Sequence, residues 1–209
     1  MSSHTEVELA QPSDIEALSL VIALSFHSLA PSVWLIADPV VRTEVFPGYF
    51  QLYVEEAMER GHVYTTKDRT AVALWLPSTD SDSDSDSASG SDYDARLAAA
   101  TGDRVEQFRA FDALLEKHHP TGIRHDHLAI LAVHPDHQRR GLGTDLLAAH
   151  HRRLDESDPP VHAYLEASDA GTRGIYLKHG YADLGDPIQL PDGPQMFPMM
   201  RPAATDQEP

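Results

Sequence analysis

In the first part of the chain, apolar residues recur in some segments at every second position, as in strands, and in others at helical spacing. Polar and apolar residues alternate over residues 6–10, which predicts a first strand, and apolar residues recur at helical spacing over about 15–27, which predicts a helix with a buried stripe. The runs 62–66 and 71–76 flank a short polar turn and predict an antiparallel hairpin. Between the first helix and this hairpin, we expect a second helical region that splits at the Pro-Gly pair 47–48.

The second part of the chain alternates strands and helices. We expect a helix over 103–117, a strand over 127–133, a helix over 141–154, a strand over 161–167, a helix over 172–178, and strands near 183–189 and 195–200. The strand over 127–133 is almost wholly apolar, which predicts burial on both faces. This order favours a single α/β domain over residues 1–202, in which helices flank a mixed sheet.

The charge balance limits the class of partner. Lys and Arg number 16 against 33 Asp and Glu, so the net charge is −17 at pH 7 with neutral histidines. A strongly acidic chain repels phosphate backbones and anionic lipids, which argues against a nucleic acid or a membrane as partner. The sequence has no cysteine, no apolar run near the ~20 residues of a membrane span and no signal peptide pattern, so we expect a cytoplasmic protein.

An Asp/Ser-rich tract interrupts the hydrophobic pattern at about residues 78–92. It carries no large apolar side chain, so we expect a disordered insertion there and a flexible tail over 203–209. Its alternating aspartates resemble a calcium loop, but the places that require Gly and Glu hold Ser87 and Tyr93. The thirteen histidines show no metal-ligand spacing, so we expect no metal and predict that they lie on the surface or in loops.

The stretch HPDHQRRGLG, residues 134–143, follows the apolar strand directly and indicates an anion-binding turn. A Walker loop requires a Gly-Lys pair, which the sequence lacks. A dinucleotide-binding turn requires a third glycine, where Leu146 stands. The pattern Q/R-x-x-G-x-G/A is matched in full from Gln138 to Gly143.

Such a turn is suited to a pyrophosphate. Successive N–H groups at a helix start converge on one anion, and the helix dipole adds positive charge. Gly141 and Gly143 let the anion approach the backbone, while Arg139 and Arg140 add charge that balances the phosphates. Taken alone, the same residues also fit an ordinary helix start whose arginines lie on the surface.

Four motifs follow one another in a fixed order: LAILAV, V-x-P-x-x-Q-R-R-G-L-G-x-x-L-L, YLEAS and IYLKHGY. Over roughly residues 125–182 they resemble the GCN5-related N-acetyltransferase (GNAT) superfamily. The form P-D-H-Q-x-x-G-L-G, the L-E-A-S strand end and the tail MFPMMRP look most similar to the puromycin N-acetyltransferase-like branch. The resemblance implies a GNAT-type acyl-CoA N-acyltransferase fold.

The resemblance also implies acetyl-CoA as co-substrate, with its pyrophosphate on the turn and its pantetheine arm along the end of the apolar strand. The residues implied in binding it are Leu131, Val133, Gln138, Arg139, Arg140, Gly141, Leu142, Gly143, Thr144 and Thr172. Thr172 stands where many relatives carry an asparagine that touches the cofactor arm, so cofactor affinity or acyl preference is expected to differ.

Two residues are implied in catalysis by the same resemblance. Tyr176 matches the tyrosine that usually protonates the departing CoA thiolate, and a phenol with a pKa of ~10 is protonated at neutral pH. Glu166 ends the YLEAS strand, where the puromycin-type proteins also carry a glutamate. Its carboxylate is a candidate for two roles, as proton acceptor for the amine or as anchor for a cationic substrate.

The acceptor is expected to bind in the N-terminal half. Aromatic residues there are candidates for a pocket wall, although such residues are more often core: Phe26, Trp34, Tyr49, Tyr53 and Trp75. We predict acetylation of a primary amine of a small molecule, such as an antibiotic or a metabolite, by direct attack in a ternary complex. The alternatives are transfer to a protein or peptide amine, an acyl-CoA-binding module without catalysis and a nucleotide-binding domain, and the sequence does not select between a monomer and a homodimer.

Overall fold

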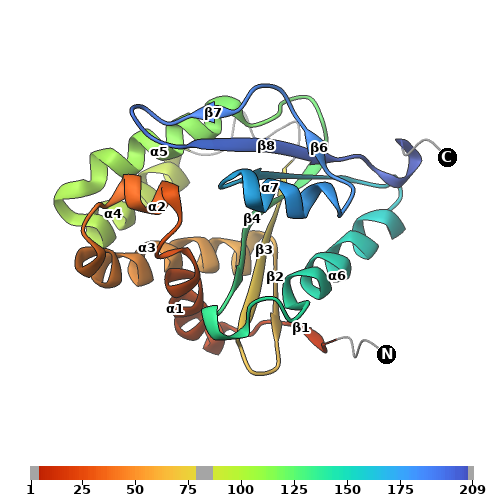
Figure 1. The fold of residues 1–209 in the computed structure, drawn as a ribbon, viewed down its shortest axis with the longest axis horizontal. Coiled ribbons are helices and arrows are strands. Elements are labelled where there is room, and N and C mark those ends of the chain that lie inside the picture. Colours follow the sequence, from red (N-terminus) through yellow and green to blue (C-terminus); the bar gives the residue numbers. More distant parts are fainter. Residues whose placement is uncertain (1–4, 79–86, 207–209) are drawn as a thin grey trace.

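The computed structural model describes residues 5–78 and 87–206, and within them eight strands form one sheet in the order β1-β2-β3-β4-β5-β8-β6, with β7 also paired to β8 (Figure 1). The strands are β1 (Val7–Leu9), β2 (His62–Thr66), β3 (Ala71–Ser78), β4 (His125–Val133), β5 (His162–Ala167), β6 (Ala182–Asp183), β7 (Ile188–Gln189) and β8 (Gln195–Arg201). The helices are α1 (Ile15–Phe26), α2 (Ala30–Leu35), α3 (Pro39–Arg60), α4 (Ser87–Thr101), α5 (Val105–His118), α6 (Leu142–Glu156) and α7 (Ala170–Leu177). Since β4 and β5 are parallel and the other pairs antiparallel, the predicted mixed sheet with flanking helices is confirmed.

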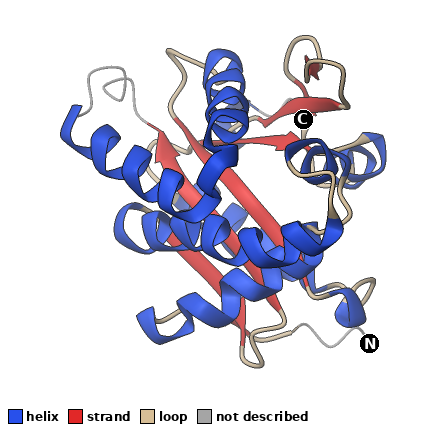
Figure 2. Cartoon of the chain, turned by 90° about the vertical axis from the view of Figure 1, so that its left-hand side faces the viewer, coloured by secondary structure: helices blue, strands red, loops and turns tan. Residues whose placement is uncertain are grey.

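Helices cover both faces of the sheet, so each face has its own hydrophobic core (Figures 1 and 2). The larger core packs α1, α3 and α5 against the sheet, and the smaller core packs α6 against the opposite face. The strand β3 serves both cores because successive side chains point to opposite faces. Val72 and Leu74 enter the larger core, whereas Ala71, Ala73 and Trp75 enter the smaller one.

The parallel strands β4 and β5 pair only at their N-terminal ends. Residues 125–127 of β4 lie opposite residues 162–164 of β5, and in the described residues no pairing between the two strands continues beyond them. Because β4 runs on to Val133, the two strands diverge and leave one edge of β4 without a strand partner. Free N–H and C=O groups on a strand edge are suited to bind an extended ligand.

The apolar composition of β4 predicted burial on both faces, and this prediction is wrong. Buried and half-buried residues alternate along it, with Ile130 and Ala132 in the larger core and Leu131 and Val133 half-buried. The half-buried side chains face a cavity, which explains why an interior strand keeps partial exposure. The apolar run in the sequence therefore forms a cavity wall as well as part of the core.

The predicted break of the second helix at residues 47–48 is wrong. The helix α3 continues through Pro47 to Arg60. A proline inside a helix loses one hydrogen bond and costs about 3 kcal/mol. Burial of the adjacent Phe46 and Phe50 offsets that cost, because burying a phenylalanine side chain contributes about 2–3 kcal/mol.

Parts of the predicted insertion and of the predicted tail are ordered in the described residues. Residues 87–101 form α4, whose Leu97 is buried in the larger core, so the few apolar residues after the Asp/Ser run suffice to dock a helix. The remaining part of the predicted insertion, residues 79–86, lies outside the described residues. In the predicted tail, Ala203 is buried and its N–H donates to Nδ1 of His162 at 3.1 Å, whereas residues 207–209 lie outside the described residues.

The predicted surface placement is also wrong for several histidines. His125, His150 and His151 are buried. Nε2 of His150 lies 2.8 Å from Oδ2 of Asp126, and Nε2 of His151 lies 3.0 Å from the hydroxyl of Tyr181. Burial lowers the pKa of all three imidazoles, so that they stay neutral at pH 7.

We expect these histidines to make the fold sensitive to acid below pH 6.5. Burial, followed by the nearby Arg201, lowers the pKa of His151 from 6.5 to about 3. Between these values the unfolded chain binds more protons than the folded chain, so the free energy of unfolding falls as the pH falls. From pH 6.5 to pH 5 the loss from His151 is roughly 2 kcal/mol.

Urea unfolding at pH 7 and pH 5 measures this loss. The variant His151→Gln keeps a polar group toward Tyr181 but takes up no proton, so its free energy of unfolding should fall less over this interval. A variant that loses as much stability as the wild type would show that His151 does not contribute.

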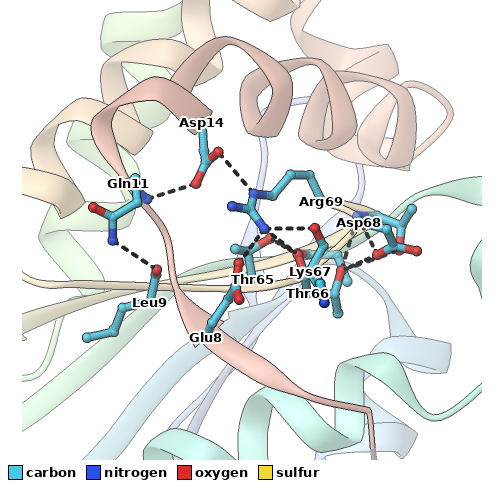
Figure 3. Close-up of polar contacts among 11 residues, drawn as sticks. Glu8, Leu9, Gln11, Asp14, Thr65, Thr66, Lys67, Asp68 and Arg69 are labelled. Carbon is cyan, nitrogen blue, oxygen red and sulfur yellow. Dashed lines mark hydrogen bonds and ion pairs between the residues drawn. The ribbon is translucent and has the colours of Figure 1, made fainter.

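Arg69 ties the β2–β3 turn to the N-terminal segment (Figure 3). Its Nε lies 3.0 Å from Oδ1 of Asp14 at the start of α1, and its Nη1 pairs with Glu8 on β1. It also donates to the carbonyl oxygens of Thr66 and Lys67 in its own turn. The hydrogen bond from Arg69 is the main cause of the lowered pKa of Asp14, so the pair stays charged.

Gly61 lies at a close approach between the end of α3 and β3. A Cβ at this position would lie 1.9 Å from the carbonyl oxygen of Trp75. Because backbone must move to admit it, we expect Gly61→Ala to lower the free energy of unfolding by about 3 kcal/mol. Denaturant unfolding measures the change, and Gly174→Ala in α7 is the control because no atom lies within 4 Å of its added Cβ. Equal midpoints for Gly61→Ala and the wild type would contradict this packing argument.

Candidate active site

A cavity of about 540 Å³ opens where β4 and β5 diverge. One side of its lining comes from β4, the turn before α6 and the helix α7, and the other side comes from α1, α2, α3 and α5. The lining is mainly apolar, and His127 of β4 and Glu166 of β5 contribute to it. The cavity thus joins the C-terminal motifs to the N-terminal helices.

The turn between β4 and α6 presents backbone donors to this cavity. Arg139 and Gly141 have positive φ angles of 60° and 88°, and α6 begins at the next residue. The first N–H groups of a helix have no partner within the helix. The residues at this helix start, Gly141, Leu142, Gly143 and Thr144, all line the cavity. This is the backbone geometry that an anion site requires.

All residues predicted to bind acetyl-CoA line the cavity except Arg140. The guanidinium of Arg140 donates to the carbonyl oxygen of Asp136 at 2.8 Å, within the turn. Gln138 lines the cavity, and its side-chain amide donates to the carbonyl oxygen of Val133 at 3.2 Å. Both side chains therefore brace the turn, and Arg139 is the arginine that reaches the cavity.

The hydroxyl of Thr172 is used to cap α7. Its Oγ1 accepts from the N–H of Asp169 at 3.1 Å and donates to the carbonyl oxygen of Asp169 at 3.0 Å. The N–H of Thr172 in turn donates to Oδ1 of Asp169 at 2.8 Å, which completes a capping box. Thr172 lines the cavity, but its single O–H is engaged inside the protein.

Tyr176 lines the cavity from α7. Its ring meets Tyr181 edge-to-face, with 5.7 Å between the ring centroids. Burial, together with the charge of Asp169, raises the pKa of the Tyr176 phenol. The phenol is therefore protonated at neutral pH, as a proton donor must be.

Glu166 and His127 form a carboxylate–imidazole pair where β4 and β5 cease to pair. Oε2 of Glu166 lies 2.8 Å from Nε2 of His127. The side chain of Glu166 is 6% exposed, and its Oε1 has no hydrogen-bond partner within the described part of the chain. Burial raises the pKa of this carboxyl, but His127 outweighs burial and the resulting pKa is lower than usual. Glu166 is therefore a buried anion, and its carboxylate also interacts with the hydroxyl of the neighbouring Tyr164.

His127 was not among the site residues predicted from the sequence. The available signal was the H-D-H alternation at the start of β4, which places His125 and His127 on the same face of a strand. Its partner Glu166 is 39 residues away in sequence, so the pair exists only once the two strands lie side by side.

Three of the aromatic residues proposed for the acceptor wall line the cavity, namely Phe26, Tyr49 and Tyr53. Phe50 and Phe111 extend the same wall. The hydroxyls of Tyr49 and Tyr53 lie 2.9 Å apart, and the hydroxyl of Tyr53 donates to Asp112 at 3.4 Å. Because these hydroxyls are paired behind the wall, the wall offers mainly apolar ring surface to a ligand.

The two tryptophans do not line this cavity. Trp75 is fully buried in the smaller core on the opposite face of the sheet, where it stacks on His150 with 4.1 Å between centroids. Trp34 donates its Nε1–H to the carbonyl oxygen of Pro191 at 2.8 Å and packs on Phe111. The structure therefore does not support the predicted substrate contacts of Trp34 and Trp75.

The described residues contain neither a helix suited to span a membrane nor a cluster of metal ligands. No helix among them combines the length and the apolar character needed to cross a membrane. Over the same residues, His, Asp and Glu side chains form no group of three or more that could hold a metal ion.

Residues 118–201 match the family model described as an acetyltransferase (GNAT) domain. This segment contains β4, the glycine turn, α6, β5 and α7, and so includes the whole region whose motifs resemble that superfamily. The match supports the GNAT superfamily and does not distinguish its branches.

Solved structures with a similar fold cover almost the whole chain. A structure described as histone acetyltransferase HPA2 and related acetyltransferase, from Corynebacterium glutamicum, has a TM-score of 0.71 at 20% identity, over 97% of this chain and 98% of that one. Arylalkylamine N-acetyltransferase 2 from Aedes aegypti has a TM-score of 0.58 at 12% identity, over 95% and 98%. The PaiA N-acetyltransferase from Thermoplasma acidophilum, in complex with coenzyme A, has 0.56 at 10% identity, over 95% and 99%. The fold is that of GNAT acetyltransferases, and with the domain match it supports an N-acetyltransferase.

Proposed function

We propose that this chain, whose residues 118–201 match a GNAT domain, transfers an acetyl group from acetyl-CoA to the primary amine of a small molecule. The observation that carries this proposal is the cavity, in which the glycine turn, Tyr176 and the Glu166–His127 pair share one space. A site that holds donor and acceptor together converts a bimolecular step into an effectively unimolecular one.

The β4–α6 turn fits the pyrophosphate of acetyl-CoA. The free N–H groups at the start of α6 donate to it, and Arg139 adds positive charge. No atom lies within 4 Å of a Cβ built at Gly141, so the backbone is open to an anion there. The free edge of β4 around Leu131 and Val133 fits the pantetheine arm, and backbone N–H groups of this edge can stabilise an oxyanion.

The side chains around the cavity supply the rest of the chemistry. Tyr176 donates a proton to the departing thiolate, which its raised pKa permits at neutral pH. Glu166 lines the cavity and its lowered pKa keeps it ionised, so its negative charge attracts a cationic amine. The bound thioester supplies the activated acyl carbonyl, and a neutral amine attacks it directly.

The wall from α1, α3 and α5 supports a small acceptor with an apolar body. Rings of Phe26, Tyr49, Phe50 and Tyr53 lie in the same cavity as the Glu166 carboxylate, so an amine and an apolar group can bind at once. The likeness of the motifs P-D-H-Q-x-x-G-L-G and L-E-A-S to the puromycin N-acetyltransferase-like branch supports an antibiotic or metabolite amine.

A panel of primary amines with acetyl-CoA, read by release of free thiol, tests the proposal. We expect at least one small amine to raise thiol release above the rate without amine. Turnover of peptides alone would favour a protein or peptide acceptor, and no turnover with any amine would favour an acyl-CoA-binding module. Thermal unfolding should show stabilisation by CoA, and stabilisation by NAD but not CoA would contradict an acetyl-CoA site.

A further inference from the structure

His127 lies where the cavity meets a cluster of titratable side chains. Its ring lines the cavity and is 19% exposed, while its Nε2 faces the buried carboxylate of Glu166. The proposed reaction leaves one proton without an acceptor. At pH 7 an alkyl amine with a pKa of about 10 is an ammonium ion, which has no lone pair for attack.

Glu166 is poorly suited to take this proton. His127 keeps the pKa of the Glu166 carboxyl below its usual value, so the carboxylate binds a cation well but is a weak base. General bases are most effective when their pKa lies near the working pH, and imidazoles ordinarily titrate near pH 6.5.

The contact between the two side chains determines which nitrogen is basic. An ionised carboxylate only accepts hydrogen bonds, so the 2.8 Å contact requires His127 to donate through Nε2–H. In the neutral ring, Nδ1 then carries the lone pair. When Nδ1 takes up a proton, the positive ring remains paired with Glu166, which stabilises it, as a carboxylate does for the histidine of a catalytic triad.

We propose that His127 accepts the proton of the acceptor ammonium at Nδ1, and that Glu166 is a positioning residue that fixes this tautomer and attracts the ammonium through its negative charge. This role rests on the proposed acetyltransferase function and deepens it. Two roles were considered for Glu166, proton acceptor and anchor for the cationic substrate. The first role then belongs to His127, and the second stays with Glu166.

The protons of the reaction then balance. The ammonium R–NH₃⁺ gives one proton to Nδ1 of His127, and the resulting amine forms the N–C bond with the acetyl carbonyl. When the C–S bond breaks, Tyr176 protonates the thiolate and is reprotonated by the second proton of the attacking nitrogen. His127 releases the first proton to water, which its exposed part can reach.

The groups that face His127 come from β5, from the segment after α5 and from its own strand. Glu166 and Tyr164 face it from β5, and His119, which follows α5, meets its ring edge-to-face at 5.1 Å between centroids. His125 on the same strand is buried, and burial lowers its pKa, so it stays neutral. Burial also raises the pKa of Tyr164, so Glu166 is the one anion among these described neighbours.

The variant His127→Gln tests the role. Its side-chain amide can still donate to Glu166 but takes up no proton. For an alkyl amine, wild-type kcat/KM should rise with pH and reach a plateau below the pKa of the amine. In the variant it should be lowered about a hundredfold at pH 7 and should keep rising until the amine itself loses its proton.

An acceptor whose amine has a pKa of about 5 separates this role from a structural one. Such an amine is already neutral at pH 7 and needs no base, so the variant should reach at least one third of the wild-type rate with it. An equal loss of rate with both amines would mean that His127 only shapes the site, and would overturn the proposal.

Two further variants complete the test. His118→Gln is the matched control, because His118 is exposed at the end of α5 and its Nδ1 contacts the carbonyl oxygen of Leu114.

Glu166→Gln removes the charge that stabilises protonated His127, so the lower limb of the pH profile should move about one unit toward acid. If His127→Gln does not fold, the shift of the lower limb in Glu166→Gln is the test. A lower limb at the same pH as in the wild type then overturns the proposal. A wild-type chain that acetylates no amine contradicts the proposed function itself, whereas turnover with an unaltered His127→Gln profile contradicts only this role.

Discussion

Replacing Tyr176 by phenylalanine is expected to lower kcat by about a thousandfold, with the dissociation constant of acetyl-CoA changed by less than about twofold. The substitution removes the hydroxyl but keeps the ring and its edge-to-face contact with Tyr181. Without the hydroxyl, the thiolate departs unprotonated from a buried site, which raises the barrier of that step. Steady-state rates and calorimetric titration with acetyl-CoA measure the two quantities.

Tyr181→Phe is the matched control for this prediction. Tyr181 is buried beside Tyr176, and its hydroxyl lies 3.0 Å from Nε2 of His151. Removing it should lower the free energy of unfolding by about 1 kcal/mol and leave kcat within about twofold. If Tyr176→Phe retained the wild-type kcat, another group would have to protonate the thiolate.

Replacing Gly141 by valine is expected to weaken acetyl-CoA binding by about a hundredfold. Gly141 has a φ of 88°, a conformation that costs a residue with a Cβ about 1–2 kcal/mol, and a branched side chain fits it worst. The glycine also lines the cavity at the helix start, so the valine would enter the space where an anion meets the N–H groups. Calorimetric titration with CoA measures the loss.

Gly185→Val separates backbone strain from loss of the anion site. Gly185 has a φ of 74°, and no atom lies within 4 Å of a Cβ built on it. It should lower thermal stability about as much as Gly141→Val and leave the dissociation constant of CoA unchanged. Equal CoA affinity in the two valine variants would show that the turn does not bind the pyrophosphate.

Much of this protein was predictable from local sequence because the relevant signals are local. The Gly-x-Gly turn after an apolar strand requires a backbone with positive φ and a helix start, and Gly141 and α6 show both. The hydrophobic periods placed β3, β4, α6 and β5 within a few residues of their observed bounds. Tyr176 and Glu166 were identified because they stand within motifs of fixed order, and both line the cavity.

Other features depend on contacts between segments far apart in sequence. The same aromatic character marked Tyr53 and Trp75 as wall candidates, but strand alternation turns Trp75 to the opposite face of the sheet. Pro47 indicated a break, and burial of its helix outweighed that local preference. These outcomes depend on which face of each element is covered, and no local pattern contains that information.

The sequence by itself determined most of the strands and helices, the glycine turn before α6 and the place of Tyr176 in its motif, since each follows from neighbouring residues. Only the tertiary structure decided that β4 and β5 diverge, that a cavity opens between them, and that His127 meets Glu166 across 39 residues. The physical reason is that a hydrogen bond between two strands requires both to be placed by the cores on either face of the sheet.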